Sequence, residues 1–308
     1  MLKSLTGKKV YITAGSAYLD IDAYACMIAM AELLQLQGIN AIAYSAAAHN
    51  YSVCPSLVKS GQIFSDLPAG DGAEEAYIIV DASDPAYLKQ SVPIEKVVAV
   101  YDHHAGFEEY WARRIGQNAK IEFIGAAATL IYRAWKKAEL QDKLSRDTAR
   151  LLIAAILDNT LNLTSANTTD EDVEVFEELC RKAEVGADWC ASYFLEVQEG
   201  VEADLHNALI NDTKAIGDNK FLPSRMSQLC VWDADCIIEK LPEIRGWFAG
   251  AWMLNIIDVQ RKCSYFVCDD CYYQEKIGRL FDVTFENGVA KTSVSYLRKE
   301  IIKKTLSN

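Results

Sequence analysis

The first half of the chain alternates between short, almost wholly apolar runs and helical segments, and this alternation most constrains the fold. The apolar runs are predicted to be strands, at residues 8–15, 39–44, 76–81 and 97–102. Between the first two runs, residues 22–37 have an apolar helical face that ends at Gly38. Continuous apolar strands that alternate with helices indicate a parallel sheet with helices on both faces. The sequence therefore predicts an α/β fold.

Three further helical segments follow, at residues 126–140, 146–157 and 169–182. The last opens with Thr-Thr-Asp-Glu-Asp, which places a capping residue before acids in the first helical turn. After about residue 188 the chain becomes more polar. We therefore predict one domain at residues 1–192 and a second at residues 193–308.

The second domain contains one strong turn signal. Asn287-Gly288 separates two segments of alternating apolar residues, 281–286 and 289–297. Asn-Gly favours the tight turn that joins two antiparallel strands. We therefore predict a β-hairpin centred on this pair.

The overall charge and the cysteines restrict the partners and the compartment. The formal net charge is −12, whereas proteins that bind long nucleic acid usually carry a basic face, so we expect no such partner. We also expect no membrane partner, because no apolar run is long enough to span a bilayer. The nine cysteines are odd in number, and no signal peptide is evident, which predicts reduced thiols in a cytoplasmic protein. The oligomeric state stays open, with a homodimer among the alternatives.

Acidic residues and histidines follow the apolar segments. They are Asp20 and Asp22 after the first strand, Asp81 and Asp102-His103-His104 at later strand ends, and Asp158 at the end of a helix. Ligands of open parallel sheets bind outside the carboxyl ends of the strands, so these strand-end side chains should face one crevice. Crowded carboxylates need cations, and carboxylate with imidazole suits Mn²⁺, Mg²⁺ or a related ion. Two such ions about 3.5–4 Å apart commonly promote attack on phosphorus.

Each of these signals is weak when it stands alone. A single aspartate at a strand end is usually a turn or helix cap, and a pair of histidines is often part of a polar loop. Four such elements in order, on successive apolar segments, favour a functional site.

Together the motifs resemble those of the DHH phosphoesterases, whose name comes from the triplet present here as Asp102-His103-His104. The motifs occur in the family's order, as DID at 20–22, VDASDP at 80–85, YDHHAG at 101–106 and AAILDNTLNLTSANTTDEDV at 154–173. Residues 124–129, IGAAAT, are similar to the family's Gly-Ser-Thr-Ala-Thr element. The resemblance covers most of residues 8–180. It implies an N-terminal DHH domain with a parallel sheet.

The second domain resembles the DHHA2 domain of family II inorganic pyrophosphatases, exopolyphosphatases and prune-like proteins. The similar segments are residues 211–216, 231–244 and 281–300. The resemblance implies a smaller α/β domain, with the active site in the cleft between the two domains. It also implies that Lys214, Arg298 and Lys299 bind substrate phosphates, as the chemistry of their cations allows. Without it, Arg298 and Lys299 would be interpreted as a solvated basic tail.

The resemblance implies two divalent cations, Mg²⁺ or Mn²⁺, with Co²⁺ as a further option. Asp81 is implied to bind both ions and Asp20 one of them. The implied ligands of the other ion are Asp22, His103 and Asp158. Family II pyrophosphatases have a histidine at the position of Ser16, and exopolyphosphatases and prune-like proteins lack it. Because hydroxyl is a poorer ligand than imidazole, we expect weaker Mn²⁺ binding beside Ser16 and relatively more competitive Mg²⁺.

These implied roles define an expected reaction. A water between the metals would attack a phosphorus atom. His104 is expected to donate to a phosphate oxygen or to assist the leaving group, while Asp102 orients the histidine pair or a nearby water. We expect hydrolysis of pyrophosphate or short polyphosphate. Two alternatives stay open: a phosphoesterase that cleaves a small nucleotide or cyclic dinucleotide, and a non-catalytic phosphate-binding scaffold. The second domain lacks the adjacent glycines typical of the nuclease branch.

Overall fold

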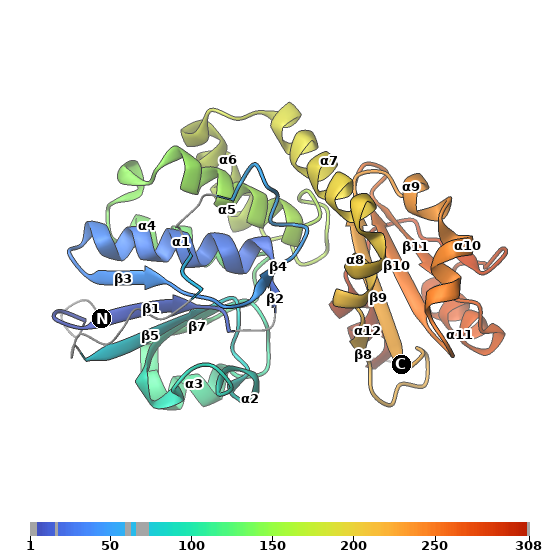
Figure 1. Ribbon diagram of the computed structural model, residues 1–308, viewed down its shortest axis with the longest axis horizontal. Helices are drawn as coiled ribbons and strands as arrows, with labels where there is room; N and C mark the ends of the chain where they lie inside the picture. Colours follow the sequence, from blue (N-terminus) through green and yellow to red (C-terminus); the bar gives the residue numbers. More distant parts are fainter. Residues whose placement is uncertain (1–4, 16–17, 59–62, 66–73, 307–308) are drawn as a thin grey trace. The chain divides into compact units, whose positions relative to one another are not determined.

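The computed structural model describes residues 5–15, 18–58, 63–65 and 74–306. Ser16, where the sequence departs from the pyrophosphatase motif, lies outside these described residues. The chain forms two compact units, residues 1–187 and 188–308 (Figure 1). The division falls at the start of α7 (Ala187–Ala203), and the boundary predicted after residue 192 lies within the same helix.

The first unit is built on a five-stranded parallel sheet, which confirms the sheet predicted from the apolar runs. Its strands, in spatial order, are β3 (Asn40–Ala43), β1 (Lys9–Thr13), β5 (Glu75–Val80), β6 (Val97–Asp102) and β7 (Ala119–Ile121). All of β1 is buried, and so is all of β5 after its first residue. A strand with both faces covered can use apolar residues at every position, so these runs are continuous rather than alternating.

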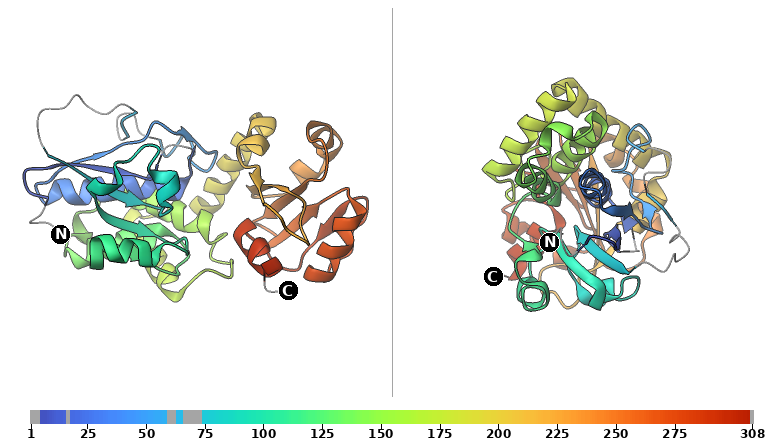
Figure 2. Two further views of the ribbon diagram at one scale, coloured as in Figure 1. Left: turned by 90° about the horizontal axis from the view of Figure 1, so that it is seen from below. Right: turned by 90° about the vertical axis from the view of Figure 1, so that its left-hand side faces the viewer.

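Helices cover both faces of this sheet (Figures 1 and 2). One face carries α1 (Ile21–Leu36), α4 (Ala127–Lys137), α5 (Arg146–Asn159) and α6 (Asp170–Ala183). The other carries α2 (Pro85–Leu88) and α3 (Glu108–Ile115), whose buried Trp111 packs with Tyr11 and Val100. Helix α1 lies between the sheet and α5, so 13 of its 16 residues are buried and it is apolar almost all round. A small two-stranded sheet joins β2 (Tyr18–Leu19) to β4 (Ala48–His49).

The second unit has its own five-stranded sheet, which is mixed. The strand order is β12 (Val289–Lys291), β11 (Cys263–Val267), β10 (Met253–Asp258), β9 (Arg225–Val231) and β8 (Lys214–Ala215). Only β9 and β10 run parallel; the other neighbours are antiparallel. Besides α7, which begins at the division, the described helices of this unit are α8 (Leu205–Asn211), α9 (Asp235–Ile238), α10 (Leu241–Ile244), α11 (Cys271–Phe281) and α12 (Arg298–Leu306). Phe266, Phe281 and Ile301 pack in its core.

The predicted hairpin at Asn287-Gly288 is wrong in its first strand. The turn itself is present, since Asn287 and Gly288 have positive φ angles of 50° and 78°. However, Phe281 is the last residue of α11, and only Glu286 bridges back to Val289. Strand β12 pairs with β11 instead. The alternating apolar side chains before the turn satisfy their pattern by packing into the core around Phe266, without a strand ladder.

The helices of the described residues can also be compared with the dimensions of a bilayer. None of them is both long enough and apolar enough to cross the hydrocarbon core.

Candidate metal and phosphate site

The carboxyl ends of β5 and β6 bring the predicted metal-binding residues together. The two strands are parallel neighbours, with Val80 opposite Tyr101. Asp81 follows β5, and its backbone N–H donates to the Tyr101 carbonyl oxygen at 2.8 Å. His103 and His104 follow Asp102, the last residue of β6. This pairing fixes the aspartate and the histidine pair side by side.

The side chains of these residues converge. Asp81 Oδ1 lies 3.3 Å from His103 Nε2 and 3.9 Å from His104 Nδ1. Asp22, from the first turn of α1, places Oδ2 3.9 Å from His103 Nε2. Ligand atoms of Asp81, His103 and His104 all lie within 4.8 Å of one another. The structure thus assembles carboxylate oxygens and imidazole nitrogens from three separate segments of the chain.

The backbone at Asp81 is unusual for a residue with a side chain. Its φ angle is 52°, in the left-handed region that non-glycine residues enter at some cost in energy. Aspartate tolerates this region better than most residues do. The conformation turns the chain sharply at the end of β5, and it is held by the hydrogen bond to Tyr101.

The orientation of His103 fits a cation. His103 Nδ1 lies 3.2 Å from the carbonyl oxygen of Ile124. A carbonyl only accepts hydrogen bonds, so Nδ1 carries a proton. Nε2 faces the carboxylate oxygens of Asp81 and Asp22, which gather negative charge around it. A divalent cation resolves this crowding, and a carboxylate–imidazole set suits Mn²⁺ and related ions.

Asp22 is held from the opposite side by the start of α4. Its two carboxylate oxygens accept the backbone N–H groups of Ala127 and Ala128, each at 2.8 Å. Cys26 also donates its thiol to Oδ1 at 3.3 Å. The Asp22 side chain is fully buried, and this burial, with the nearby Asp81 charge, raises its pKa to about 7. The carboxylate therefore holds a proton at mildly acidic pH unless a cation replaces it.

Asp172 supports the segment that holds both His103 and Asp22. The sequence assigned it no role beyond the first turn of its helix. Its buried carboxylate accepts from the Gly125 N–H at 2.8 Å and the Thr129 hydroxyl at 2.6 Å. Gly125 lies between Ile124, which orients His103, and the α4 amides that bind Asp22. A Cβ at Gly125 would come within 2.6 Å of Asp172 Oδ2, so only glycine fits this close approach. Asp172 thus holds the segment that contacts both His103 and Asp22.

Asp102 and His104 form a hydrogen-bonded pair. Asp102 Oδ1 lies 2.8 Å from His104 Nδ1 and also accepts the backbone N–H groups of His103 and His104. Burial raises the Asp102 pKa, but the hydrogen bond and charge of His104 outweigh it, so that the pKa is lowered overall. The His104 side chain is 53% exposed. The Asp102 carboxylate thus fixes the His104 ring through Nδ1, which leaves Nε2 as the ring nitrogen that can contact a substrate.

Two further predicted metal ligands, Asp20 and Asp158, also lie in the first unit. Asp20 caps the N-terminus of α1, where Oδ1 accepts the Ala23 N–H at 3.0 Å. Asp158 lies in the last turn of α5 and is half-buried. Metal binding by Asp20 and Asp158 stays a prediction.

The predicted phosphate-binding cations lie in the second unit, where Arg298 is largely engaged within its own unit. The Arg298 guanidinium donates to the carbonyl oxygen and the carboxylate of Asp212. Its side chain is only 12% exposed. Lys214 in β8 and Lys299 in α12 are both exposed. Asp212 lies two residues before Lys214, so the Asp212–Arg298 pair connects the segments that carry the two lysines.

The chain was compared in sequence with known proteins. No family model matches the chain. In sequence the chain is similar to manganese-dependent inorganic pyrophosphatases. The one from Exiguobacterium is 24% identical over 92% of this chain and 93% of its own length. The one from Staphylococcus haemolyticus is 26% identical over 91% of this chain and 92% of its own length.

Solved structures share the fold. A Methanococcus jannaschii protein assigned to the family II inorganic pyrophosphatases superimposes with a TM-score of 0.67. It is 18% identical, over 96% of this chain and 99% of that one. An exopolyphosphatase-related protein from Bacteroides fragilis gives a TM-score of 0.54 at 12% identity, over 98% of this chain and 91% of that one.

The chain shares the two-domain α/β fold of these structures, and an aspartate–histidine cluster lies at the carboxyl ends of its first sheet. The curated relatives to which it is similar are manganese-dependent inorganic pyrophosphatases. The resemblance stated from the motifs is therefore confirmed.

Proposed function

We propose that the chain is a divalent-metal-dependent phosphohydrolase that cleaves the phosphoanhydride bond of inorganic pyrophosphate. One observation carries the proposal: His103 Nε2 faces the carboxylates of Asp81 and Asp22 at 3.3 and 3.9 Å. Manganese-dependent pyrophosphatases that align over more than nine-tenths of the chain support the choice of substrate and of cation. Mn²⁺ is the first candidate, with Mg²⁺ and Co²⁺ as the alternatives.

Asp81, His103 and Asp22 would hold one cation, and Asp158 and Asp20 are proposed as further ligands. Bound divalent cations lower the pKa of coordinated water and offset the charge of the phosphates. The role of the chain is to fix the ligands before the cation arrives. Hydrogen bonds from Ala127 and Ala128 hold Asp22, and the Ile124 carbonyl holds His103.

His104 is proposed to act on the substrate phosphate. Asp102 holds the ring by Nδ1 at 2.8 Å, and the side chain is half exposed beside Asp81. When protonated, Nε2 can donate to a phosphate oxygen or to the leaving group as its negative charge develops. The buried Asp102 carboxylate stabilises the positive ring and keeps its orientation fixed.

Lys214 and Lys299 are proposed to bind substrate phosphates through their exposed ammonium groups. The contacts of Arg298 support a positioning role in addition to phosphate binding. Its bonds to Asp212 use part of the guanidinium, so we propose that it positions the lysine-bearing segments and offers its remaining donors to phosphate.

The small phosphate substrate and the thiols fit a cytoplasmic location, which we also propose. The nine cysteines are odd in number, as expected of thiols in a reducing compartment.

Phosphate release by the metal-depleted protein tests the function. The protein is assayed with pyrophosphate, tripolyphosphate and a linear dinucleotide, each with Mn²⁺, Mg²⁺ or Co²⁺. We expect pyrophosphate turnover with Mn²⁺ and none without a divalent cation. Dinucleotide cleavage without anhydride cleavage would favour a phosphodiesterase. A folded protein that turns over no substrate with any metal would favour a scaffold.

A further inference from the structure

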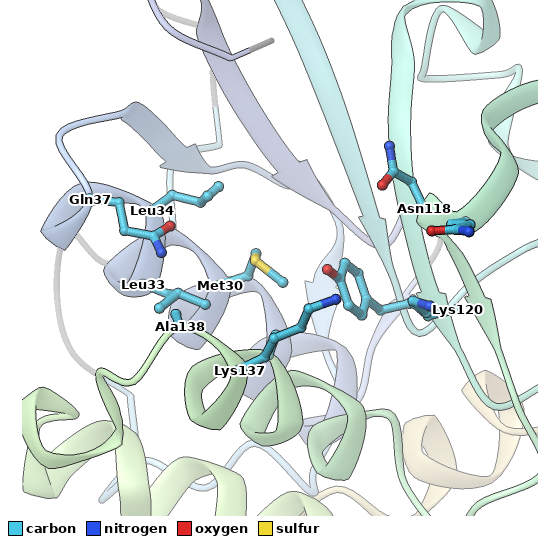
Figure 3. A pocket seen from close by; sticks show the side chains of 11 residues that line it. Met30, Leu33, Leu34, Gln37, Asn118, Lys120, Lys137 and Ala138 are labelled. Carbon is cyan, nitrogen blue, oxygen red and sulfur yellow. The ribbon is translucent and has the colours of Figure 1, made fainter. Parts of the chain in front are cut away.

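A cavity lies in the first unit, apart from the residues proposed to bind metal. It has a volume of about 380 Å³ and is bounded by α1, α4 and the strands β6 and β7 (Figure 3). It lies toward the C-terminal ends of α1 and α4, whereas their N-terminal ends hold Asp22. At 1.5 Å per helical residue, this places the cavity roughly 10–20 Å from Asp22 along the helices. None of the metal-binding residues lines it.

One wall of the cavity is apolar. Met30, Leu33 and Leu34 of α1 are buried and form this wall. The methionine thioether adapts to flat or irregular groups, and the leucines add apolar surface. The volume falls in the range of pockets that hold small organic molecules.

The remaining walls carry amide and ammonium groups. Gln37 enters from α1, and Asn118 and Lys120 enter from the β7 side. Lys137 of α4 extends into the cavity (Figure 3). None of the residues that line the cavity bears a carboxylate. The lining thus holds two cations and no acid, in a chain whose formal net charge is −12.

The two lysines of the cavity differ from ordinary surface lysines in their lack of ion pairs with the described residues. Throughout the part of the chain that the structure describes, neither Lys120 nor Lys137 forms an ion pair. The neighbouring Lys136 does, with Glu178 at 3.3 Å. Lys136 and Lys137 both lie in the last turn of α4, where either cation stabilises the helix dipole. A role in the dipole alone would make the two lysines equivalent, so they form a matched pair for testing.

We propose that this cavity binds a small phosphate monoester that carries a flat organic group, such as a nucleoside monophosphate. The organic group would lie against Met30 and Leu34, with Gln37 and Asn118 as hydrogen-bonding partners of its polar edge. The phosphate would lie between Lys120 and Lys137, where its charge offsets both ammonium groups. This ligand is distinct from the pyrophosphate proposed for the metal site.

The cavity shares structural elements with the metal site. Tyr101 lines the cavity, and its carbonyl oxygen accepts the Asp81 N–H at 2.8 Å. Helix α4 lines the cavity near one end and binds Asp22 at the other. A ligand that shifts β6 or α4 therefore changes the metal ligands. Coupling of this kind is reciprocal, so the phosphate monoester and Mn²⁺ must alter each other's affinity by the same factor.

Calorimetric titration of the metal-free protein with uridine 5′-monophosphate tests the site. Uridine and inorganic phosphate are titrated separately. We expect the nucleotide to bind at least about tenfold more tightly than either part, because the apolar wall and the lysines act together. The absence of nucleotide binding at millimolar concentration would overturn the proposal, and so would equal affinity for inorganic phosphate.

Variants locate the binding. Lys120→Met and Lys137→Met should each weaken nucleotide binding by about tenfold, and Lys136→Met should leave it unchanged. Ala134→Leu fills the cavity from a helix that accepts leucine, and it should abolish binding. Equal effects of Lys136→Met and Lys137→Met would contradict the proposal.

A final variant separates the cavity from the metal site. Asp81→Asn should leave nucleotide binding to the metal-free protein intact, whereas loss of binding would place the nucleotide at the metal site and overturn the proposal. In the unsubstituted protein, nucleotide should change the Mn²⁺ affinity, and an unchanged affinity would overturn the coupling. These measurements need no turnover, so their failure is distinct from failure of the proposed hydrolase activity.

Discussion

His103 Nδ1 lies 3.2 Å from the carbonyl oxygen of Ile124, and this contact directs Nε2 toward the carboxylates of Asp81 and Asp22. The Ile124 carbonyl belongs to the segment that also supplies the Ala127 and Ala128 amides to Asp22. One short segment before and at the start of α4 therefore orients an imidazole and a carboxylate at once. Its own position depends on the hydrogen bond between Gly125 and Asp172.

Asp81 is expected to be indispensable for turnover. Asp81→Ala removes a carboxylate that contacts both histidines, and the loss should exceed the roughly 10- to 100-fold effect typical of residues that only support metal ligands. The measurement is phosphate release at saturating Mn²⁺. Asp84→Asn is the matched control, because it changes an aspartate in the same segment whose role is to cap α2. Similar activities for the two variants would contradict the two-metal interpretation.

Asp172 is expected to control metal affinity without touching the metal. Asp172→Asn weakens the contacts to Gly125 and Thr129, so Mn²⁺ affinity should fall by roughly 10- to 100-fold. Calorimetric titration with Mn²⁺ measures this. Asp170→Asn, in the first turn of the same helix, should leave the affinity unchanged. A lower melting temperature with unaltered Mn²⁺ affinity would show that Asp172 serves stability alone.

The raised pKa of Asp22 makes metal binding depend on pH. In the metal-free protein this carboxyl group titrates near pH 7 rather than at its ordinary 3.8. Below pH 7 the cation must displace its proton, so Mn²⁺ affinity should fall as the pH drops from 7 to 6. Calorimetry in buffers of different ionisation enthalpy should detect proton release at pH 6. Asp22→Asn should abolish the proton release that accompanies Mn²⁺ binding at pH 6.

The same shift affects the stability of the metal-free protein. The folded-state pKa of Asp22 lies above its unfolded value, so its contribution favours folding below about pH 4 and is lost as the pH rises to about 7. Denaturant unfolding of the unsubstituted protein and of Asp22→Asn across this interval measures the difference. The unsubstituted protein should lose stability relative to the variant as the pH rises. The opposite slope would show that burial does not dominate at this site.

His104 is expected to affect turnover more than metal binding. His104→Asn removes the exposed ring nitrogen proposed to donate a proton, and kcat should fall by roughly 10²- to 10⁴-fold. Asp102→Asn should lower kcat in the same direction, because it disturbs the 2.8 Å bond that orients the ring. Steady-state kinetics with both variants, together with Mn²⁺ titration, separates catalysis from binding. A loss of Mn²⁺ affinity equal to the loss of kcat would reassign His104 to the metal.

The Asp212–Arg298 pair is expected to act on KM. Asp212→Ala leaves the largely buried Arg298 guanidinium without its carboxylate, which should lower the free energy of unfolding by about 1–3 kcal/mol. The segments that carry Lys214 and Lys299 would lose their alignment, so KM for pyrophosphate should rise. Asp218→Ala, an exposed substitution in the loop after β8, is the control. If Asp212→Ala lowered KM by freeing Arg298, then phosphate binding by the arginine would outweigh its role in positioning the lysine-bearing segments.

The sequence predicted the local elements of the first unit well. Its apolar runs lie within a few residues of β1, β3, β5 and β6, because strands buried on both faces have a simple signature. The same reasoning failed before Asn287-Gly288, where the alternating apolar residues pack into the core after α11. Alternation reports which side chains are buried, and it does not report whether a partner strand is available.

The sequence by itself determined which residues stand at the ends of the apolar strands, and thereby the class of chemistry. Asp81 and His103 were found in this way, since parallel strands bring their carboxyl ends to one edge. Only the tertiary structure decided how these side chains are held. The left-handed backbone of Asp81, the amides on Asp22 and the reach of Asp172 to Gly125 depend on contacts between segments that are distant in the chain. Such contacts leave no periodic pattern in the sequence, because each is specified by a single residue whose partner is fixed by the fold.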